Sequence, residues 1–65
     1  MQVFINGKQT ELPSGTSVQN LIEQFDIRDK VAVEINEEIV SRSRFELHTL
    51  EDGDRVEIVR AIGGG

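Results

Sequence analysis

Three consecutive glycines, Gly63, Gly64 and Gly65, are the last residues of the sequence and offer a chemical group of their own. Glycine buries no side chain and loses more backbone entropy on folding than any other residue, so this run adds little to a packed structure. It instead presents the Gly65 carboxylate on a thin stalk, with no Cβ atom to clash in a narrow channel. We therefore expect residues 63–65 to form a flexible tail that enters a partner protein, and residues 1–62 to form the folded domain.

The remaining reactive side chains do not form a recognisable catalytic or metal-binding group. The chain has one histidine, His48, and no cysteine, which cannot supply the ligands of a structural zinc site. The adjacent carboxylates Glu37-Glu38 and Glu51-Asp52 could suggest acid–base chemistry, but both pairs fall in predicted turns, where solvated carboxylates are expected. We expect no catalytic residue, no metal and no bound cofactor, so the chain is not predicted to be an enzyme.

Charge and length limit the classes of partner. The 65 residues include 12 acidic and 7 basic side chains, for a net charge of −5. This charge disfavours nucleic acid, whose binding requires neutralised phosphates, and favours a basic protein surface. The sequence has neither an apolar run of the roughly 20 residues that span a bilayer nor a signal peptide. We expect one small domain that is cytoplasmic, does not bind membranes and is a monomer on its own.

The N-terminal residues predict a β-hairpin. Residues 1–6 alternate, with Met1, Val3 and Ile5 on one face of a strand. Asn6-Gly7 suits a type I′ turn, because both positions of that turn need a positive φ. Residues 8–12 then return as a polar strand of the kind found at the edge of a sheet.

A helix is predicted over residues 17–25. Thr16 is expected to be its N-cap and Gln19, three residues later, to complete a capping box. One apolar stripe then follows at helical spacing, formed by Val18, Leu21, Ile22 and Phe25.

The second half of the chain is predicted to form three strands joined by turns. The strands are expected at 31–35, 39–40 and 55–62, the turns at 36–38 and 51–54, and an irregular segment or a short helical turn at 43–50. Core anchors in this half are expected at Val31, Val33, Ile35, Phe45, Leu47, Leu50, Val56 and Ile58. The whole pattern predicts an α+β fold of the β-grasp type, a mixed sheet of four or five strands with one main helix across one face.

The sheet face away from the helix is expected to dock partners. If the alternate apolar residues face the helix, then Phe4 and Val59 face solvent. A parallel arrangement of the first and last strands would place both side chains on one exposed patch, which Ala61 and Ile62 extend toward the tail. Exposed apolar surface of this kind is a common site of protein association.

Eight features along the whole chain together resemble the ubiquitin-like sulfur carriers, in particular those of thiamine biosynthesis. They are the strand at 1–5, Asn6-Gly7, the helix at 18–25, Val33-Glu-Ile-Asn36, Ile39-Val40 with Arg42, Asp52-Gly53-Asp54, Val56-Glu-Ile-Val59 and Gly64-Gly65. The resemblance implies that an adenylating, E1-like activating enzyme uses ATP to convert the Gly65 carboxylate into an acyl-adenylate. A sulfur donor such as a cysteine desulfurase would then convert Gly65 into a thiocarboxylate (1-thioglycine), and thiazole synthase would accept the sulfur.

Three other functions fit the same features. The small subunit of molybdopterin synthase would use the same thiocarboxylate for another cofactor. A ubiquitin-like protein modifier would instead join its terminal glycine to a lysine. A β-grasp binding module would have an inert tail. The first two share with the thiamine carrier the need for a free Gly65 carboxylate, and the binding module does not.

Overall fold

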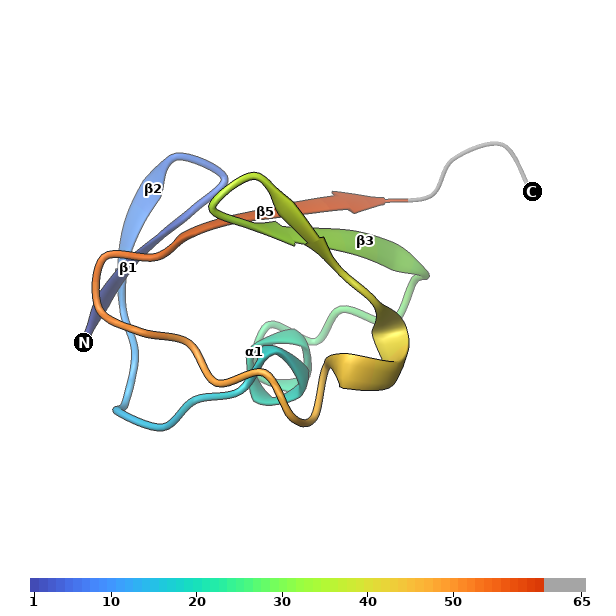
Figure 1. Ribbon diagram of the computed structural model, residues 1–65, viewed down its shortest axis with the longest axis horizontal. Helices are drawn as coiled ribbons and strands as arrows, with labels where there is room; N and C mark the ends of the chain where they lie inside the picture. The colour runs from blue at the N-terminus through green and yellow to red at the C-terminus, as the bar shows by residue number, and fades with distance from the viewer. Residues whose placement is uncertain (61–65) are drawn as a thin grey trace.

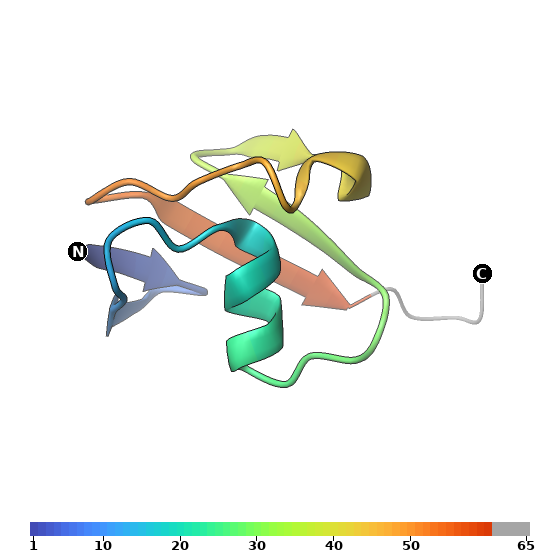
Figure 2. The same cartoon turned by 90° about the horizontal axis from the view of Figure 1, so that it is seen from below.

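One mixed sheet and one α-helix make up the part of the chain that the structure, a computed structural model, describes, residues 1–60. In chain order the elements are β1 (Gln2–Ile5), β2 (Lys8–Glu11), α1 (Val18–Gln24), β3 (Val31–Ile35), β4 (Glu38–Val40), the 3₁₀ helix η1 (Arg42–Arg44) and β5 (Arg55–Arg60). The strands lie in the order β2-β1-β5-β3-β4, with β1 parallel to β5 and every other neighbouring pair antiparallel. Figures 1 and 2 show α1 crossing one face of this sheet.

This arrangement confirms the α+β fold predicted from the sequence, with five strands. The alternating strands β1 and β5 both lie inside the sheet, and the polar strand β2 lies at its edge. The predicted hairpin turn is also confirmed, because Asn6 and Gly7 have φ angles of 50° and 83°. The predicted last strand, 55–62, is described as far as Arg60; its final two residues lie outside the described part of the chain.

The core lies between the sheet and α1. Its buried apolar side chains come from every strand except β2, from the helix and from three loop positions. They are Val3, Ile5, Leu12, Val18, Leu21, Ile22, Val31, Val33, Ile35, Val40, Phe45, Leu50 and Val56. Ile58 is partly buried against the same cluster, so Val56 and Ile58 of β5 both face the core, as predicted.

The start of the helix differs from the prediction by one residue. The N-cap is Ser17, not Thr16: the Ser17 hydroxyl accepts from the Asn20 amide at 3.0 Å, and the Asn20 side chain accepts from the Ser17 amide at 3.3 Å. The Thr16 hydroxyl instead donates to the Pro13 carbonyl at 2.7 Å, so it is occupied by the preceding turn. The capping box therefore uses Ser17 and Asn20, and the expected pair of Thr16 and Gln19 was wrong.

Two residues expected in the core are exposed. Phe25 is 45 % exposed because the helix ends at Gln24 and the chain turns away at Asp26, whose φ is 54°. Ile27 packs against the core at this end of the helix in its place. Leu47 is 75 % exposed, because it lies in the turn that follows η1.

The turn between β3 and β4 is tighter than predicted. Asn36 and Glu37 both have positive φ angles, 53° and 71°, and Glu38 already belongs to β4. The predicted turn at 36–38 is therefore one residue too long, and the predicted strand at 39–40 is one residue too short.

Candidate functional site

Strand β5 determines where the C-terminal segment leaves the folded domain. Its last described residue is Arg60, which pairs with Val31 of β3. The expected carrier Gly65, the stalk residues Gly63 and Gly64, and the docking residues Ala61 and Ile62 all lie outside the described residues, so their roles stay predictions. An extended chain covers at most about 3.3–3.6 Å per residue, so Gly65 can reach no farther than ~18 Å from Arg60.

The neighbouring strands hold β5 on both sides. All five residues of β3 pair with β5, from Val31 with Arg60 to Ile35 with Val56. On the other side, β1 pairs with β5 at only two positions and ends at Ile5. On the β1 side, only residues beyond this short pairing can continue the hydrogen bonding along β5.

Two asparagines add hydrogen bonds to β5, one from each side. The Asn6 side-chain oxygen accepts from the Ile58 amide at 2.8 Å, and the Asn6 backbone amide donates to the Val56 carbonyl at 2.8 Å. On the opposite side, the Asn36 side chain accepts from the Arg55 amide at 3.0 Å and donates to Asp54 at 3.1 Å. Each asparagine sits at a turn with positive φ, so the turns that end β1 and β3 also fasten β5.

The expected docking residues Phe4 and Val59 lie on the sheet face away from the helix. Phe4 is 39 % exposed and Val59 is 53 % exposed. Phe4 lies beside Arg55 in the register of β1 and β5, and Glu57 separates Arg55 from Val59 along β5. The two apolar residues therefore share a face, with charged side chains between them.

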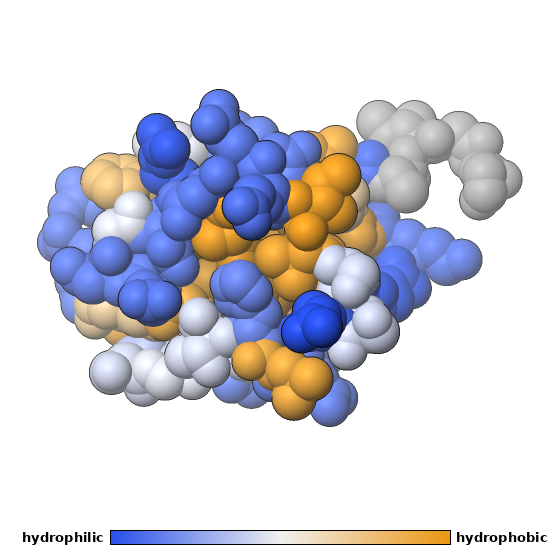
Figure 3. Space-filling view, viewed as in Figure 1, coloured by the Kyte–Doolittle hydropathy of each residue, from blue (hydrophilic) through white to orange (hydrophobic). Residues whose placement is uncertain are grey.

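The same face contains an exposed apolar residue that the sequence analysis did not assign to it. Ile39 of β4 is 76 % exposed and lies opposite Glu34 of β3, on the outward side, because its neighbour Val40 points into the core. The sequence offered one sign of this position: in a strand, Ile39 and Val40 must point to opposite faces of the sheet. Figure 3 shows apolar atoms gathered over β4 in the orientation of Figure 1, with polar residues around them.

Two carboxylates of the predicted turn at 51–54, those of Asp52 and Asp54, have structural roles. Asp52 accepts from the Gln2 amide at 2.7 Å, which ties the turn to β1. Asp54 accepts from the Glu51 amide at 2.8 Å, which closes the turn itself. These carboxylates are therefore used for hydrogen bonding within the fold, rather than presented as an acid–base pair.

His48 also contributes to the fold, through its backbone. Its carbonyl accepts from the Val18 amide at 2.9 Å, at the start of α1. Among residues 1–60, no three His, Cys, Asp or Glu side chains lie together as a possible metal site. No helix in the described part of the chain is long and apolar enough to cross a membrane.

Comparison with known proteins identifies relatives along the whole chain. A model of the ThiS family matches residues 3–65. The chain is 35 % identical to the sulfur carrier protein ThiS of Escherichia coli strain K12, and the match covers all of both chains. It is 39 % identical to part of a thiazole synthase of Paramagnetospirillum magneticum, where the match covers the whole chain and 20 % of that protein.

The fold agrees with these sequence matches. The crystal structure of the thiamine biosynthesis protein ThiS of Geobacter metallireducens superposes with a TM-score of 0.87 at 32 % identity, over all of both chains. This agreement confirms the predicted β-grasp fold and the resemblance on which the functional prediction rests. The chain therefore belongs to the ThiS family of sulfur carrier proteins, which are carriers rather than enzymes.

Proposed function

We propose that the chain carries sulfur as a thiocarboxylate on Gly65 and delivers it for formation of the thiazole ring of thiamine. The observation that carries this proposal is the match to sulfur carriers along the whole chain, which runs through Gly65 itself. Strand β5 supports it, because the two neighbouring strands and two asparagines hold the strand from which the tail continues.

The proposed chemistry converts a poor electrophile into a sulfur donor in two steps. A Gly65 carboxylate oxygen attacks the α-phosphorus of ATP on the adenylating enzyme, and pyrophosphate leaves. Hydrosulfide, which a thiol reductant releases from the persulfide of a donor such as a cysteine desulfurase, then attacks the Gly65 carbonyl carbon, and AMP leaves. The product is the thiocarboxylate, 1-thioglycine at position 65. The chain's own contribution is to position this group, since the partner enzymes supply the catalysis and the ATP.

Thiazole synthase is the partner proposed to accept the sulfur. In the thiazole synthases of Paramagnetospirillum magneticum and Magnetococcus marinus, a segment similar to the whole chain makes up 20 % of the protein. A carrier joined to a synthase in one protein is evidence that the two act together. This observation favours the thiazole branch over the small subunit of molybdopterin synthase. Because the chemistry uses ATP, we place it in the cytoplasm.

The outward sheet face is the proposed docking surface for these enzymes. Phe4 and Val59 provide partly exposed apolar area, and Ala61 and Ile62 follow directly after the described end of β5. If the folded domain binds the partner through this face, the glycine tail is left free to enter the partner's active site.

The adenylation step gives a direct test of the proposed function. We expect the purified chain to support ATP–pyrophosphate exchange by the adenylating enzyme, because formation of the acyl-adenylate is reversible. A chain with one alanine appended after Gly65 should support at least about 10-fold less, since its terminal carboxylate then belongs to a residue with a Cβ atom and lies one residue farther from the domain. Equal exchange with both chains would overturn the proposal.

A second measurement separates the sulfur carrier from a protein modifier. The thiocarboxylate form should transfer its sulfur to thiazole synthase in a single turnover and return the unmodified chain. An isopeptide-linked conjugate to a lysine, with no sulfur transfer, would identify a modifier instead.

A further inference from the structure

Charge is distributed unevenly over the chain, whose net charge is −5. One group of charged residues comes from the loop after α1, the first residue of η1 and the end of β5. It has four cations, Arg28, Lys30, Arg42 and Arg60, and two carboxylates, Asp26 and Asp29, a local charge of +2. The remaining ionisable side chains comprise three cations and ten carboxylates, a charge of −7. A positive group on an otherwise acidic protein favours contact with a negatively charged partner surface.

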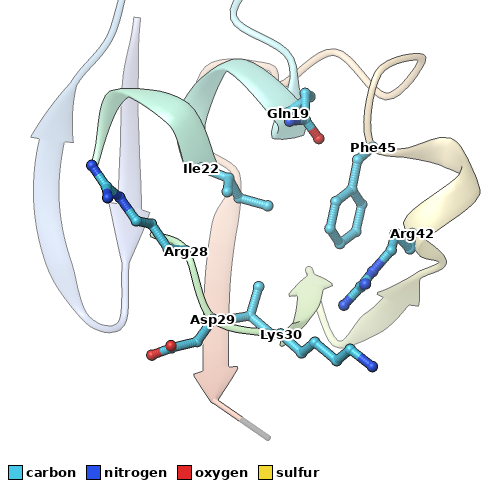
Figure 4. A pocket seen from close by; sticks show the side chains of 8 residues that line it. Gln19, Ile22, Arg28, Asp29, Lys30, Arg42 and Phe45 are labelled. Carbon is cyan, nitrogen blue, oxygen red and sulfur yellow. The ribbon is translucent and has the colours of Figure 1, made fainter. Parts of the chain in front are cut away.

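A pocket of about 210 Å³ opens beside this positive group. Its apolar lining comes from Ile22, Val31 and Phe45, which are core residues with small exposed areas. Figure 4 shows Ile22 and Phe45 on the two sides of the pocket, with Lys30 and Arg42 along the same edge of it. The pocket is smaller than the roughly 300–1,000 Å³ of typical small-molecule sites, so one inserted side chain suits it better.

Lys30 and Arg42 are the cations that remain available at this edge. Arg28 pairs with Asp26 at 3.0 Å, and Figure 4 shows its side chain directed away from Phe45. Within the part of the chain that the structure describes, neither Lys30 nor Arg42 forms an ion pair. Both can therefore meet carboxylates from outside without first losing an internal partner.

The pocket adjoins the end of β5. Asp29, one of its lining residues, forms an ion pair with Arg60 at 3.4 Å. Arg60 is the residue after which the chain continues toward Gly65. A protein that takes up the tail must therefore approach the molecule next to the pocket.

We propose that this pocket docks a segment of the adenylating enzyme in which a large apolar side chain lies between carboxylates. The apolar side chain covers Ile22 and Phe45, while the carboxylates face Lys30 and Arg42. The choice of the adenylating enzyme as partner rests on the proposed function. The kind of segment that fits the pocket follows from the lining residues alone. This contact is separate from the one proposed for Phe4 and Val59, because the pocket lies between α1 and η1 rather than on the outward sheet face.

A peptide titration tests the pocket without ATP or enzyme. The probe is the acetylated, amidated peptide Glu-Asp-Leu-Glu-Asp, followed by amide NMR shifts of the isotope-labelled full chain. We expect saturable shifts at residues 28–31 and 42–45 with a millimolar dissociation constant, since one side chain and a few charges provide little affinity. The matched peptide Lys-Lys-Leu-Lys-Lys should cause none. Absent shifts, or equal shifts with both peptides, would overturn the pocket assignment.

Charge reversal tests the choice of partner. Lys30→Glu and Arg42→Glu should each weaken binding of the chain to the adenylating enzyme by about 10-fold at low salt and less at high salt, since exposed charges are screened. The maximal exchange rate at saturating carrier should stay within about twofold, because the Gly65 chemistry is untouched. Melting temperatures of both variants verify that they fold.

The control for these variants is Lys8→Glu on the edge strand β2, away from the pocket lining. It makes the same charge change and should alter binding by less than about twofold. Equal weakening by all three variants would show a general charge effect and overturn the docking proposal. If the chain binds the peptide, but Lys30→Glu and Arg42→Glu do not weaken its binding to the adenylating enzyme, the choice of partner is wrong and the pocket assignment stands. Normal adenylation without peptide binding would overturn the pocket and leave the proposed function in place.

Discussion

Glycine is expected to serve two different purposes in this chain, and single substitutions separate them. Gly53 has a φ of +88°, and a Cβ atom added there would meet no other atom within 4 Å. Glycine is therefore needed at this position because it can adopt the backbone conformation of the turn before β5. Gly64 lies in the proposed tail, where the absence of a side chain is expected to matter for entry into a channel.

Gly64→Ala is expected to fold normally and to be adenylated at least about 10-fold more slowly, a loss of ~1.4 kcal/mol in transition-state stabilisation, because its methyl group clashes in the channel. The measurement is kcat/KM for ATP–pyrophosphate exchange, with the melting temperature as the test of folding. The matched control is Gly53→Ala, which should lower stability by about 1–2 kcal/mol and leave exchange unchanged. Normal exchange kinetics in Gly64→Ala would contradict the channel argument.

Phe4→Ala tests the docking role of the outward sheet face. Phe4 is 39 % exposed, so its removal should cost less than about 2 kcal/mol of stability, compared with ~3–5 kcal/mol for a fully buried phenylalanine. Binding to the adenylating enzyme and to thiazole synthase should weaken by about 10-fold or more, because Phe4 is proposed to be a central contact. Calorimetric titration measures the binding, and Gln24→Ala on the exposed part of α1 is the control. A drop in stability typical of a core residue, with unchanged binding, would contradict the docking role.

At the scale of elements, the turns of this fold do more than connect strands. β1 ends at Ile5, and the Asn6 side chain then binds the Ile58 amide, so the hairpin turn continues the hydrogen bonding of β5 where β1 stops. Asn36 binds the Arg55 amide at the other end of the same strand. The strand that leads to the tail is thus fixed near both of its described ends.

Asn6→Ala should destabilise the chain by about 1–2 kcal/mol, because alanine is disfavoured at positive φ and the bond to the Ile58 amide is lost. Asn6→Gly tolerates the backbone conformation and loses only the bond, so it should cost about 1 kcal/mol. In both variants, amide hydrogen exchange measured by NMR should become faster at Ile58 than in the unmodified chain. Exchange at Val33 in the core should change less. Unchanged exchange at Ile58 would show that the Asn6 side chain does not hold β5.

Elements with a repeating pattern could be predicted from the sequence, and single residues at their ends could not. The strict alternation of Val3, Ile5 and Val33, Ile35 placed two strands correctly. The helix N-cap was assigned one residue too early because Thr16 and Ser17 have equivalent hydroxyls. The hydrogen bond from Thr16 to Pro13, which decides between them, depends on the folded turn.

The sequence was least informative where function depends on residues distant in the chain. Phe4 and Val59 could be assigned to one face because each lies in an alternating strand. The pocket could not be predicted, because Ile22, Lys30 and Arg42 come from three separate segments with no common pattern. Leu47 looked like a core anchor by residue type alone, and the turn after η1 leaves it exposed.

At the scale of the whole molecule, we expect folding and sulfur carrying to depend on different parts of the chain. Among residues 1–60, the side chains of the buried core belong to residues 3–56. A chain that ends at Ile62 should therefore melt within about 4 °C of the full chain, which corresponds to less than ~1 kcal/mol in a domain of this size. The same shortened chain should support no ATP–pyrophosphate exchange. A large loss of stability would contradict the division into a domain at 1–62 and a tail at 63–65.

The central claim is that Gly65 carries sulfur, and the mass of the intact chain tests it most directly. The purified chain is incubated with ATP, a sulfide source and the adenylating enzyme, and its mass is then measured and the change located by fragmentation. We expect a gain equal to the replacement of one oxygen by sulfur, located at Gly65 and lost on hydrolysis. An unchanged mass, with the same enzyme active on a known carrier, would contradict the claim.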